Sequence, residues 1–272
     1  MKSLQYLLPA VLLMATTIAC AQTVVASEPV SVAQEPALSK NPTFLFRTLS
    51  ASEEFDRLAA NGTQWTTTVG YTETFHNSSM SVGGSLPFGA AASTAGSPAG
   101  DRPVVLGEGS FKAQWIPYVT SQHGVLLTTS MTVPSAGDDR IGDGKWLLTP
   151  SVAYARFWGP RLLVAQFFQQ QVSFAGPAGR SKVNRSDLDL YSVYSSRTLR
   201  WWLTGDLNLR VDEANHDHVR SAATVGYGRG LRKVFGGTLN GSVQAAAGVG
   251  RYRPYDYMIS GGLSMVGFQW KR

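Results

Sequence analysis

The sequence predicts an all-β fold, an antiparallel transmembrane β-barrel of about twelve strands. Three observations predict it: apolar and polar residues alternate, the alternating segments are long enough to cross a membrane, and the connections alternate between short and long. The 272-residue chain is 43% hydrophobic but only 15% charged, whereas soluble domains carry roughly 25% charged residues. Beyond the first two dozen residues, no run approaches the ~20 apolar residues that a spanning helix needs. The apolar residues are therefore dispersed along the chain.

The alternation has a period of two. From Trp201 to Val211 the odd-numbered residues are apolar or glycine and the even-numbered ones are mostly polar, and the pattern recurs over 65–75, 124–133 and 239–249. Successive side chains of a strand point to opposite faces, so each of these strands has one apolar face. A soluble β-sandwich also alternates, but its strands usually have about five or six residues, and spanning a membrane takes about 9–11. Many segments here have that length, which favours the barrel.

The connections support the same fold. Short ones fall near 121–123, 158–160 and 195–199, and longer ones near 89–102, 135–144 and 176–185. Outer-membrane barrels have short periplasmic turns and long external loops. The predicted strands are 43–49, 64–75, 79–88, 104–119, 124–134, 145–157, 161–174, 186–194, 200–212, 218–230, 237–250 and 256–270. Ten strands is the alternative count, because the first and third are weak. Residues 50–60 are predicted as a short helical turn inside a loop.

The N-terminus has the features of an export signal. Lys2 is followed by an apolar stretch over 7–19 and by the small-x-small site around Cys20, so residues 1–21 are predicted as a signal peptide cleaved after Ala21. Lipidation at Cys20 is the alternative, against which Thr17 is an unfavourable first residue. Cleavage removes the single cysteine and with it disulfide chemistry and zinc ligation through sulfur. Residues 22–40 are predicted as a flexible periplasmic lead-in, and 41–272 as one barrel domain.

Aromatic residues mark the predicted membrane boundaries. Val266, Phe268 and Trp270 alternate towards the C-terminus, as in closing strands that the barrel-assembly machinery recognises. Tryptophans near the predicted strand ends are expected to form aromatic girdles at the two interfaces. These are Trp65, Trp115, Trp146, Trp158, Trp201 and Trp202.

Charge and reactive residues narrow the chemistry. The net charge of +6 comes from scattered residues, and no basic run or nucleic-acid motif is present, so nucleic acid is not expected as a partner. His216 and His218 flank Asp217 and are candidates for a metal site or for activating water. The alternative, which the sequence favours, is a solvated polar loop. Three glycines over 226–230 are not followed by a helix, so they relieve crowding in a strand and do not bind a dinucleotide.

The polar face of the strands predicts the lining of a lumen. We expect its charges either to set the field that selects solutes or to pair with one another and rigidify a narrow barrel. About twelve strands give a lumen wider than that of eight-stranded barrels and narrower than that of 16-stranded porins. The expected lining residues are Lys112, Gln114, Gln169, Gln171, Arg200, Asp206, Asn208, Arg210, Arg220, Asn240 and Gln244.

Four segments in order carry a resemblance to a known family: Met131 to Asp139, Ile141 to Pro150, Gln169 to Gly176, and Val183 to Asn184. They resemble the uncharacterised outer-membrane transporter-like proteins of the phenol meta-cleavage-pathway family. The similarity covers about residues 105–270, and the serine-phenylalanine-alanine-glycine block at 173–176 is its most specific part. The chain departs from the family at 135–136, where serine-alanine replaces threonine-glycine.

The resemblance implies a transport role and no catalytic residues. We therefore expect an outer-membrane channel that passes small molecules, including aromatic or hydrophobic ones, by passive diffusion through a polar, charge-lined lumen. It is expected not to be an enzyme and to need no cofactor; its partners would be membrane lipid and lipopolysaccharide, a small-molecule solute, and the barrel-assembly machinery. One alternative is a barrel enzyme or metal-binding surface protein centred on His216 and His218. Another is a structural or adhesive barrel.

Overall fold

The structure, a computed structural model, describes residues 45–58, 62–76, 78–92, 104–136, 142–198 and 200–269. The predicted signal peptide and lead-in lie outside the described residues. The strands are β1 (Thr48–Leu58), β2 (Thr63–Phe75), β3 (Met80–Ala92), β4 (Val105–Leu106), β5 (Ser110–Val119), β6 (His123–Thr132), β7 (Trp146–Trp158), β8 (Leu162–Ala175), β9 (Asn184–Ser195), β10 (Trp201–Asp212), β11 (His218–Val234), β12 (Gly237–Val249) and β13 (Tyr255–Val266). A single 3₁₀ turn, η1 (Glu213–Asn215), joins β10 and β11.

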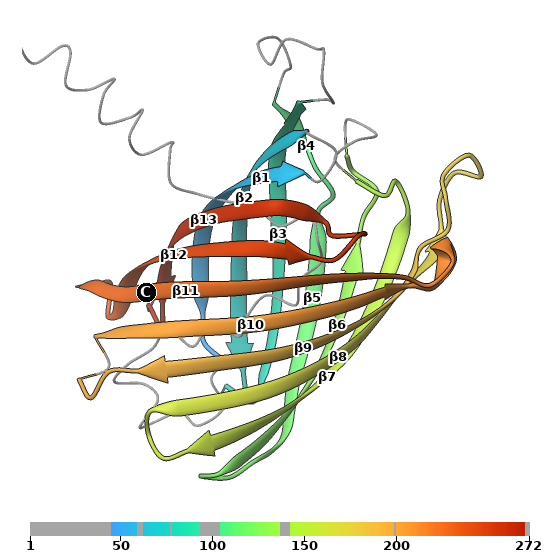
Figure 1. Cartoon of the computed structure of the whole chain (residues 1–272). Helices are drawn as coiled ribbons and strands as arrows, with labels where there is room; N and C mark the ends of the chain where they lie inside the picture. The colour runs from blue at the N-terminus through green and yellow to red at the C-terminus, as the bar shows by residue number, and fades with distance from the viewer. Residues whose placement is uncertain are drawn as a thin grey trace, which may run out of the picture.

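The strands close into an antiparallel ring of 12, with the two-residue β4 as an extra piece beside β3. Each strand pairs with its neighbours in the chain, and the ring is completed where β1 pairs with β13 and β2 pairs with β3 (Figure 1). Closure leaves no unpaired strand edge, which is the condition for placing a sheet in lipid. The prediction of a 12-stranded antiparallel barrel is confirmed.

The first strand corrects the sequence prediction. A strand over 43–49 and a helical turn over 50–60 were expected, whereas β1 runs over 48–58 and residues 43 and 44 lie outside the described part. The charge run Glu53, Glu54, Asp56 and Arg57 hides the alternation, because acidic residues occur on both faces of this strand. The segment is nonetheless paired along both edges, with β2 and with β13, and these ladders outweigh the local helical preference.

A bulge divides the strand expected over 104–119. β4 and β5 are separated by residues 107–109, whose backbone stays close to β3 through a hydrogen bond from Gly107 N to Pro87 O of 2.8 Å. Pro87 has no N–H to donate, so the regular ladder cannot continue through it. The remaining strands match the expected ones within a few residues, except that β13 ends at Val266. Phe268 lies beyond the strand and is buried, so only part of the expected alternating terminus is strand.

The two ends of the barrel differ in their connections. At one end, here called the short-turn end, the strands are joined by 76–79, 120–122, 159–161, 196–200 and 235–236. The other end, the long-loop end, carries 93–104, 133–145 and 176–183 together with shorter connections at 59–62, 213–217 and 250–254. Residues leading into β1 and out of β13 meet at the short-turn end, where Gly267 N donates to Arg47 O at 2.8 Å. The expected alternation of loop lengths is therefore present.

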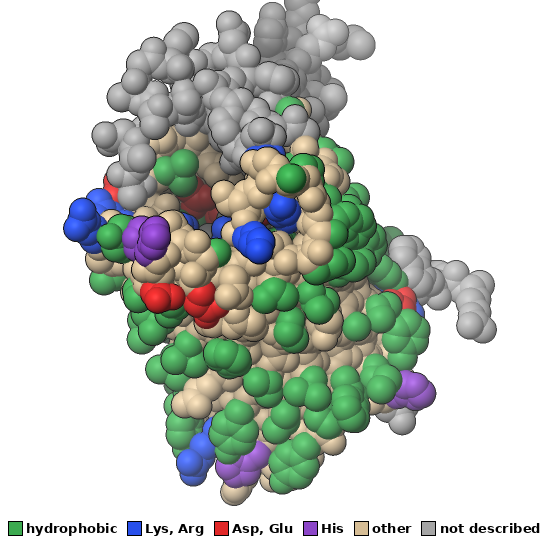
Figure 2. Space-filling model, turned by 90° about the vertical axis from the view of Figure 1, so that its right-hand side faces the viewer, with side chains coloured by type: hydrophobic (Ala, Val, Ile, Leu, Met, Phe, Trp, Pro, Cys, Tyr) green, Lys and Arg blue, Asp and Glu red, His purple; other side chains and the backbone are tan. Residues whose placement is uncertain are grey.

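The outer wall of the barrel is apolar. Large hydrophobic side chains stand exposed along it, including Leu207 at 57%, Val225 at 67% and Ile259 at 58%. Figure 2 shows them spread over the wall, with charged side chains gathered at the hollowed end. Near the short-turn end, Trp201 stacks on Tyr227 and packs against Tyr194, as expected of an interfacial aromatic girdle. No helix among the described residues is long and apolar enough to cross a membrane.

Candidate channel lumen

The inner wall is polar and charged towards the long-loop end. Arg210 on β10 forms a buried ion pair with Asp187 on β9, with an Nε–Oδ1 distance of 2.5 Å. Gln169 on β8 donates to the same carboxylate at 2.8 Å. Asn208 donates to Asp189 at 2.6 Å. Because these partners sit on neighbouring strands at the same level, the hydrogen bonds fix the side chains along the wall.

A second group of charges continues this network to the mouth. Arg185 pairs with Asp143, from the long loop before β7, at 2.9 Å, and lies 3.9 Å from Asp212. Arg220 lies 3.6 Å from the same Asp212 carboxylate. The carboxylate of Asp143 therefore reaches into the barrel. It joins a row of acidic and basic side chains that alternate along β9, β10 and β11. Such an arrangement holds the arginines in place and offsets their charge.

Two further contacts fasten the loops to the mouth. Glu108, in the bulge between β4 and β5, accepts a hydrogen bond from Gly144 N at 2.6 Å. Lys145 Nζ donates to Pro177 O at 2.6 Å. Burial raises the pKa of the Glu108 carboxyl above its ordinary value, while the N–H groups of Gly144 and Asp143 act in the opposite direction. Loop segments 107–109, 142–145 and 176–183 thus form one connected rim.

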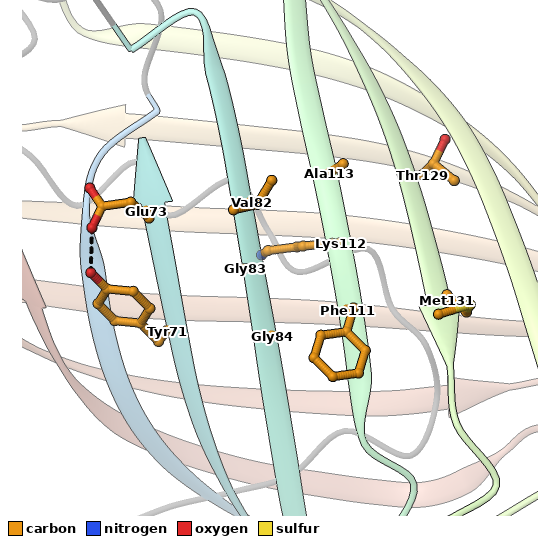
Figure 3. Close-up of a pocket in the computed structure, with 10 residues that line it drawn as sticks. All are labelled: Tyr71, Glu73, Val82, Gly83, Gly84, Phe111, Lys112, Ala113, Thr129 and Met131. Carbon is orange, nitrogen blue, oxygen red and sulfur yellow. Dashed lines mark hydrogen bonds between the residues drawn. The ribbon is translucent and has the colours of Figure 1, made fainter. Parts of the chain in front are cut away.

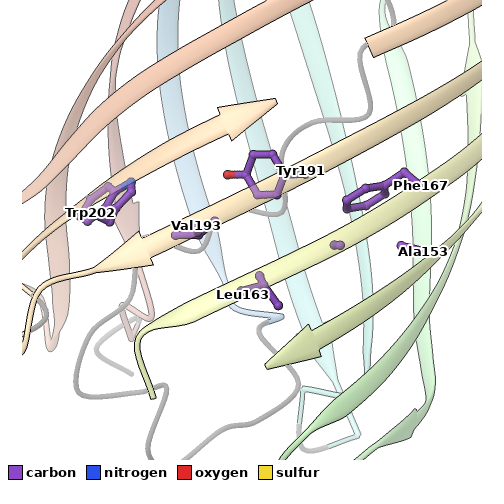
Figure 4. Packing of buried hydrophobic residues seen from close by; sticks show 7 residues of the cluster. Ala153, Leu163, Phe167, Tyr191, Val193 and Trp202 are labelled. Atoms are coloured by element: carbon purple, nitrogen blue, oxygen red, sulfur yellow. The ribbon is translucent and has the colours of Figure 1, made fainter. Parts of the chain in front are cut away.

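Towards the short-turn end, one side of the inner wall is apolar. The lining here, called the apolar patch, comes from neighbouring strands β7, β8, β9 and β10 and consists of Ala153, Leu163, Ala165, Phe167, Tyr191, Val193 and Trp202 (Figure 4). Leu126, Ala155 and Phe157 pack against it. Leu45, from the segment before β1, is 4% exposed and lines a cavity together with Phe157 and Leu163. This side of the lumen wall is therefore lined by packed hydrophobic side chains at this end.

The opposite side of the inner wall is made of small residues. At one level of the ring, Trp202 on β10 is followed around the barrel by Gly228, Ser242, Gly262 and Ser52. A Cβ atom at position 228 would fall 2.0 Å from the Trp202 indole, so the indole lies over this glycine. Beyond the indole is a recess of about 150 Å³ lined by Ser52, Tyr191, Trp202, Thr204, Asn240 and Gln244, among others.

A separate groove lies on the outside of the barrel. It has a volume of about 630 Å³ and crosses β2, β3, β5 and β6, with Gly83 and Gly84 in its floor and Phe111 and Met131 at its side (Figure 3). Tyr71 donates to Glu73 there at 2.5 Å, and Glu73 pairs with Arg47 at 2.7 Å. Its apolar lining faces outwards, so the groove is part of the lipid-facing wall and not of the lumen.

The structure places most of the predicted lining residues on the inner wall, as the alternation with exposed apolar neighbours shows. These are Lys112, Gln114, Gln169, Gln171, Asp206, Asn208, Arg210, Arg220, Asn240 and Gln244. Arg200 is different: it is exposed in the turn before β10. Trp202, expected in an interfacial girdle, faces inwards and is 8% exposed.

The histidine pair lies in the connection around η1. His216 has a left-handed backbone with φ of 55°, and the ring of His218 stacks on Tyr252 with centroids 3.9 Å apart. Among the residues that the structure describes, no group of three or more His, Cys, Asp or Glu side chains is arranged to hold a metal ion. His218 thus packs against Tyr252, whereas His216 is exposed.

Sequence reasoning missed two parts of the lining. The first is the apolar patch: β7 and β8 carry apolar residues on both faces, a pattern typical of strands covered on both sides, and this run was the available signal. The second is a set of acidic residues on β1, Glu54 and Asp56, both at 6% exposure. Their even spacing with Ser50 and Ser52 was the signal there.

Comparisons with known proteins agree with this geometry. Neither a family model nor a curated protein matches the chain. Among solved structures, it is similar to the COG4313 outer membrane channel from Pseudomonas putida F1, with a TM-score of 0.63 and 11% identity over 82% of this chain and 96% of that one. It is also similar to KdgM porin (TM-score 0.56, 9% identity, 82% and 99% covered) and NanC porin (0.54, 10%, 82% and 100%).

At these identities the likeness defines the fold. The chain has the barrel architecture seen in outer-membrane channels and porins: a closed antiparallel ring with an apolar outside and a partly polar inside.

Proposed function

We propose that this protein is an outer-membrane channel that lets small molecules cross by passive diffusion, and that it favours solutes with an aromatic or hydrophobic part. The observation that carries the proposal is that the wall of the lumen is charged in one half of the barrel and apolar in the other. The long-loop half bears the paired charges around Arg185 and Arg210, and the short-turn half bears the apolar patch around Phe167. A solute with a polar and an apolar part finds partners in both halves.

The proposed function includes export, insertion into the outer membrane and an aromatic solute. The signal peptide over 1–21 would direct export, with cleavage after Ala21, and the barrel-assembly machinery would insert the chain so that the long-loop end faces lipopolysaccharide. The resemblance of residues 105–270 to the phenol meta-cleavage-pathway family supports an aromatic solute. The channel performs no covalent chemistry in this proposal.

The test compares two adjacent phenylalanines on β8. Phe167 faces the lumen at 6% exposure and Phe168 faces outwards at 50%. Refolded protein in planar bilayers should give a small conductance that increases in Phe167→Ala, because the substitution removes an aromatic ring from the inner wall. Phe168→Ala is the matched control and should leave the conductance unchanged.

Solute preference is measured separately by liposome swelling. Wild-type protein should admit L-phenylalanine, whose zwitterion hardly crosses lipid, faster than glucose, a sugar of similar size, and Phe167→Ala should reduce this preference. A closed trace in every condition, in protein that still shows heat-modifiable gel migration, would contradict the channel. Equal effects of the two phenylalanine substitutions would contradict the role of the apolar patch.

A further inference from the structure

The groove on the outside of the barrel has a floor of small residues between larger ones. Gly84 on β3 is the register partner of Phe111 on β5. In the adjacent row, Ala113 on β5 stands between Val82 and Thr129. Phe111 is 60% exposed and Val82 is 47% exposed, so large side chains project outwards on both sides of the floor (Figure 3). The groove is therefore an apolar depression in the lipid-facing wall.

The groove runs obliquely along the wall. At β2 it begins with Glu73, which lies close to the short-turn end of its strand, just before Phe75. At β6 it ends with Thr129, which lies past the middle of a strand that starts from the short-turn end at His123. It crosses three strand spacings, roughly 14 Å in all, and half of a bilayer's hydrocarbon core is roughly 15 Å thick. The groove therefore has the length of an acyl chain in one leaflet.

An ion pair stands at the short-turn end of the groove. Glu73 pairs with Arg47 at 2.7 Å, and the two side chains keep 24% and 28% of their surface exposed. Arg47 Nη1 also donates to Phe268 O at 3.3 Å, and the guanidinium lies 5.8 Å from the centroid of that ring. Charges on the lipid-facing wall are costly at the bilayer midplane and tolerated near the interface. The pair therefore lies at the level of the lipid headgroups.

The charges and the groove together match a zwitterionic phospholipid. In the proposed insertion the short-turn end faces the periplasm, so the headgroups at this level belong to the periplasmic leaflet. A phosphoethanolamine headgroup carries a phosphate, which complements the Arg47 guanidinium, and an ammonium group, which complements the Glu73 carboxylate. The acyl chain of the same molecule is long enough to follow the apolar floor away from this end.

We propose that the groove binds one molecule of phosphatidylethanolamine, with its headgroup across Arg47 and Glu73 and one acyl chain over Gly84 and Ala113. The inference goes beyond the proposed passage of solutes, and rests only on the membrane orientation included in the proposed function. An anionic phospholipid fits less well, because Glu73 repels a second negative charge beside Arg47. The bound lipid is a fixed part of the outer wall and does not enter the lumen.

Native mass spectrometry of the refolded full chain tests the proposal. The protein is released from detergent that contains equal amounts of dipalmitoyl phosphatidylethanolamine and dipalmitoyl phosphatidylglycerol, which have the same chains and different headgroups. We expect one retained lipid, with phosphatidylethanolamine favoured roughly threefold, as for a partly exposed charge pair. Glu73→Gln leaves the Arg47 charge alone and should reverse the preference towards phosphatidylglycerol. A merely structural role of Glu73 would instead lower the retention of both lipids alike.

Ala113→Phe fills the floor of the groove and should abolish the retention of both lipids. Ala245→Phe is the matched control, because Ala245 is an exposed, outward-facing alanine on β12, away from the groove. Heat-modifiable migration checks folding, and Thr129→Phe at the far end of the groove replaces Ala113→Phe if that variant does not refold.

Four results would overturn the proposal: equal retention of the two lipids by the wild-type protein, an unchanged ratio in Glu73→Gln, an unchanged lipid adduct in Ala113→Phe, or a dimer of this chain in place of the adduct. Bilayer conductance separates the two proposals. Conduction without a lipid preference refutes this inference alone, and selective lipid binding by a protein that does not conduct refutes the channel alone.

Discussion

The indole of Trp202 lies over Gly228 on the neighbouring strand, so closely that a Cβ atom at position 228 would fall 2.0 Å from the ring. The two residues are direct register partners in the β10–β11 ladder. A tryptophan can lie along the inner wall at this point because its partner has no side chain.

Gly228→Ala should therefore destabilise the barrel and turn the indole towards the centre of the lumen. Overpacking of this kind costs about 1–3 kcal/mol, which urea unfolding of the refolded protein would measure. Gly230→Ala is the matched control on the same strand, because the nearest atoms to a Cβ there are 3.7 Å away. Equal losses in the two variants would show that the indole does not depend on Gly228.

Arg210→Met should strongly destabilise the barrel. It leaves Asp187, whose side chain has 0% relative exposure, buried without its cation, and breaking such a pair costs about 3–5 kcal/mol. The Arg210→Met, Asp187→Leu double variant should recover most of that loss, since no unpaired charge remains. Unfolding midpoints of the single and double variants give the comparison. A double variant less stable than Arg210→Met would contradict this account.

The two faces of the wall should respond differently to a new charge. Leu207 points to lipid at 57% exposure. Leu207→Arg should therefore lower the folding free energy by about 2–4 kcal/mol, the cost of an arginine near the middle of a lipid-facing strand. Thr128, at the middle of β6, faces the polar lumen, so the folding free energy lost in Thr128→Arg should be clearly smaller. Folding free energies measured in lipid vesicles test the difference. Similar costs at both positions would contradict the assigned faces.

The rim of the mouth should loosen as the pH rises. The pKa of Glu108 is raised in the folded protein by burial, so the folded state holds its proton more strongly than the unfolded one. The resulting stabilisation is present at low pH and is lost as the pH rises from the ordinary glutamate range through the raised value. Glu108→Gln should remove this dependence. Hydrogen-exchange protection of 142–145, corrected for intrinsic rates, is the measurement; identical pH profiles in both proteins would contradict the prediction.

The strands of this barrel could be predicted because lipid on one side and solvent on the other impose a strict alternation. That signal is strong over 201–212 and failed at β1, where Glu53 and Arg57 stand on the face that elsewhere carries apolar residues. Glu53 is tolerated there because it is 7% exposed and accepts a hydrogen bond from Thr67.

The lining was harder to predict than the strands. Period-two alternation separates the two faces of β8 but does not reveal that Phe167 points inwards and Phe168 outwards, since both are apolar. The recess beside Trp202 was missed for a different reason: Ser52 and Thr204, which both line it, are 152 positions apart in the sequence, and ring closure between β1 and β13 brings them together. The ion pairs of Arg185 and Arg210 likewise depend on cross-strand register.

The hydrogen bond from Gly267 N to Arg47 O shows that the chain enters the first strand of the ring next to the point where it leaves the last one. A short linker could therefore join these two positions, and the break in the backbone could move to an external loop, such as 250–254, with every strand pairing kept. The order in which the strands are synthesised is therefore separable from the architecture they build. Circular permutants of this protein would show whether insertion into the membrane depends on the closed ring or on which strand is synthesised last.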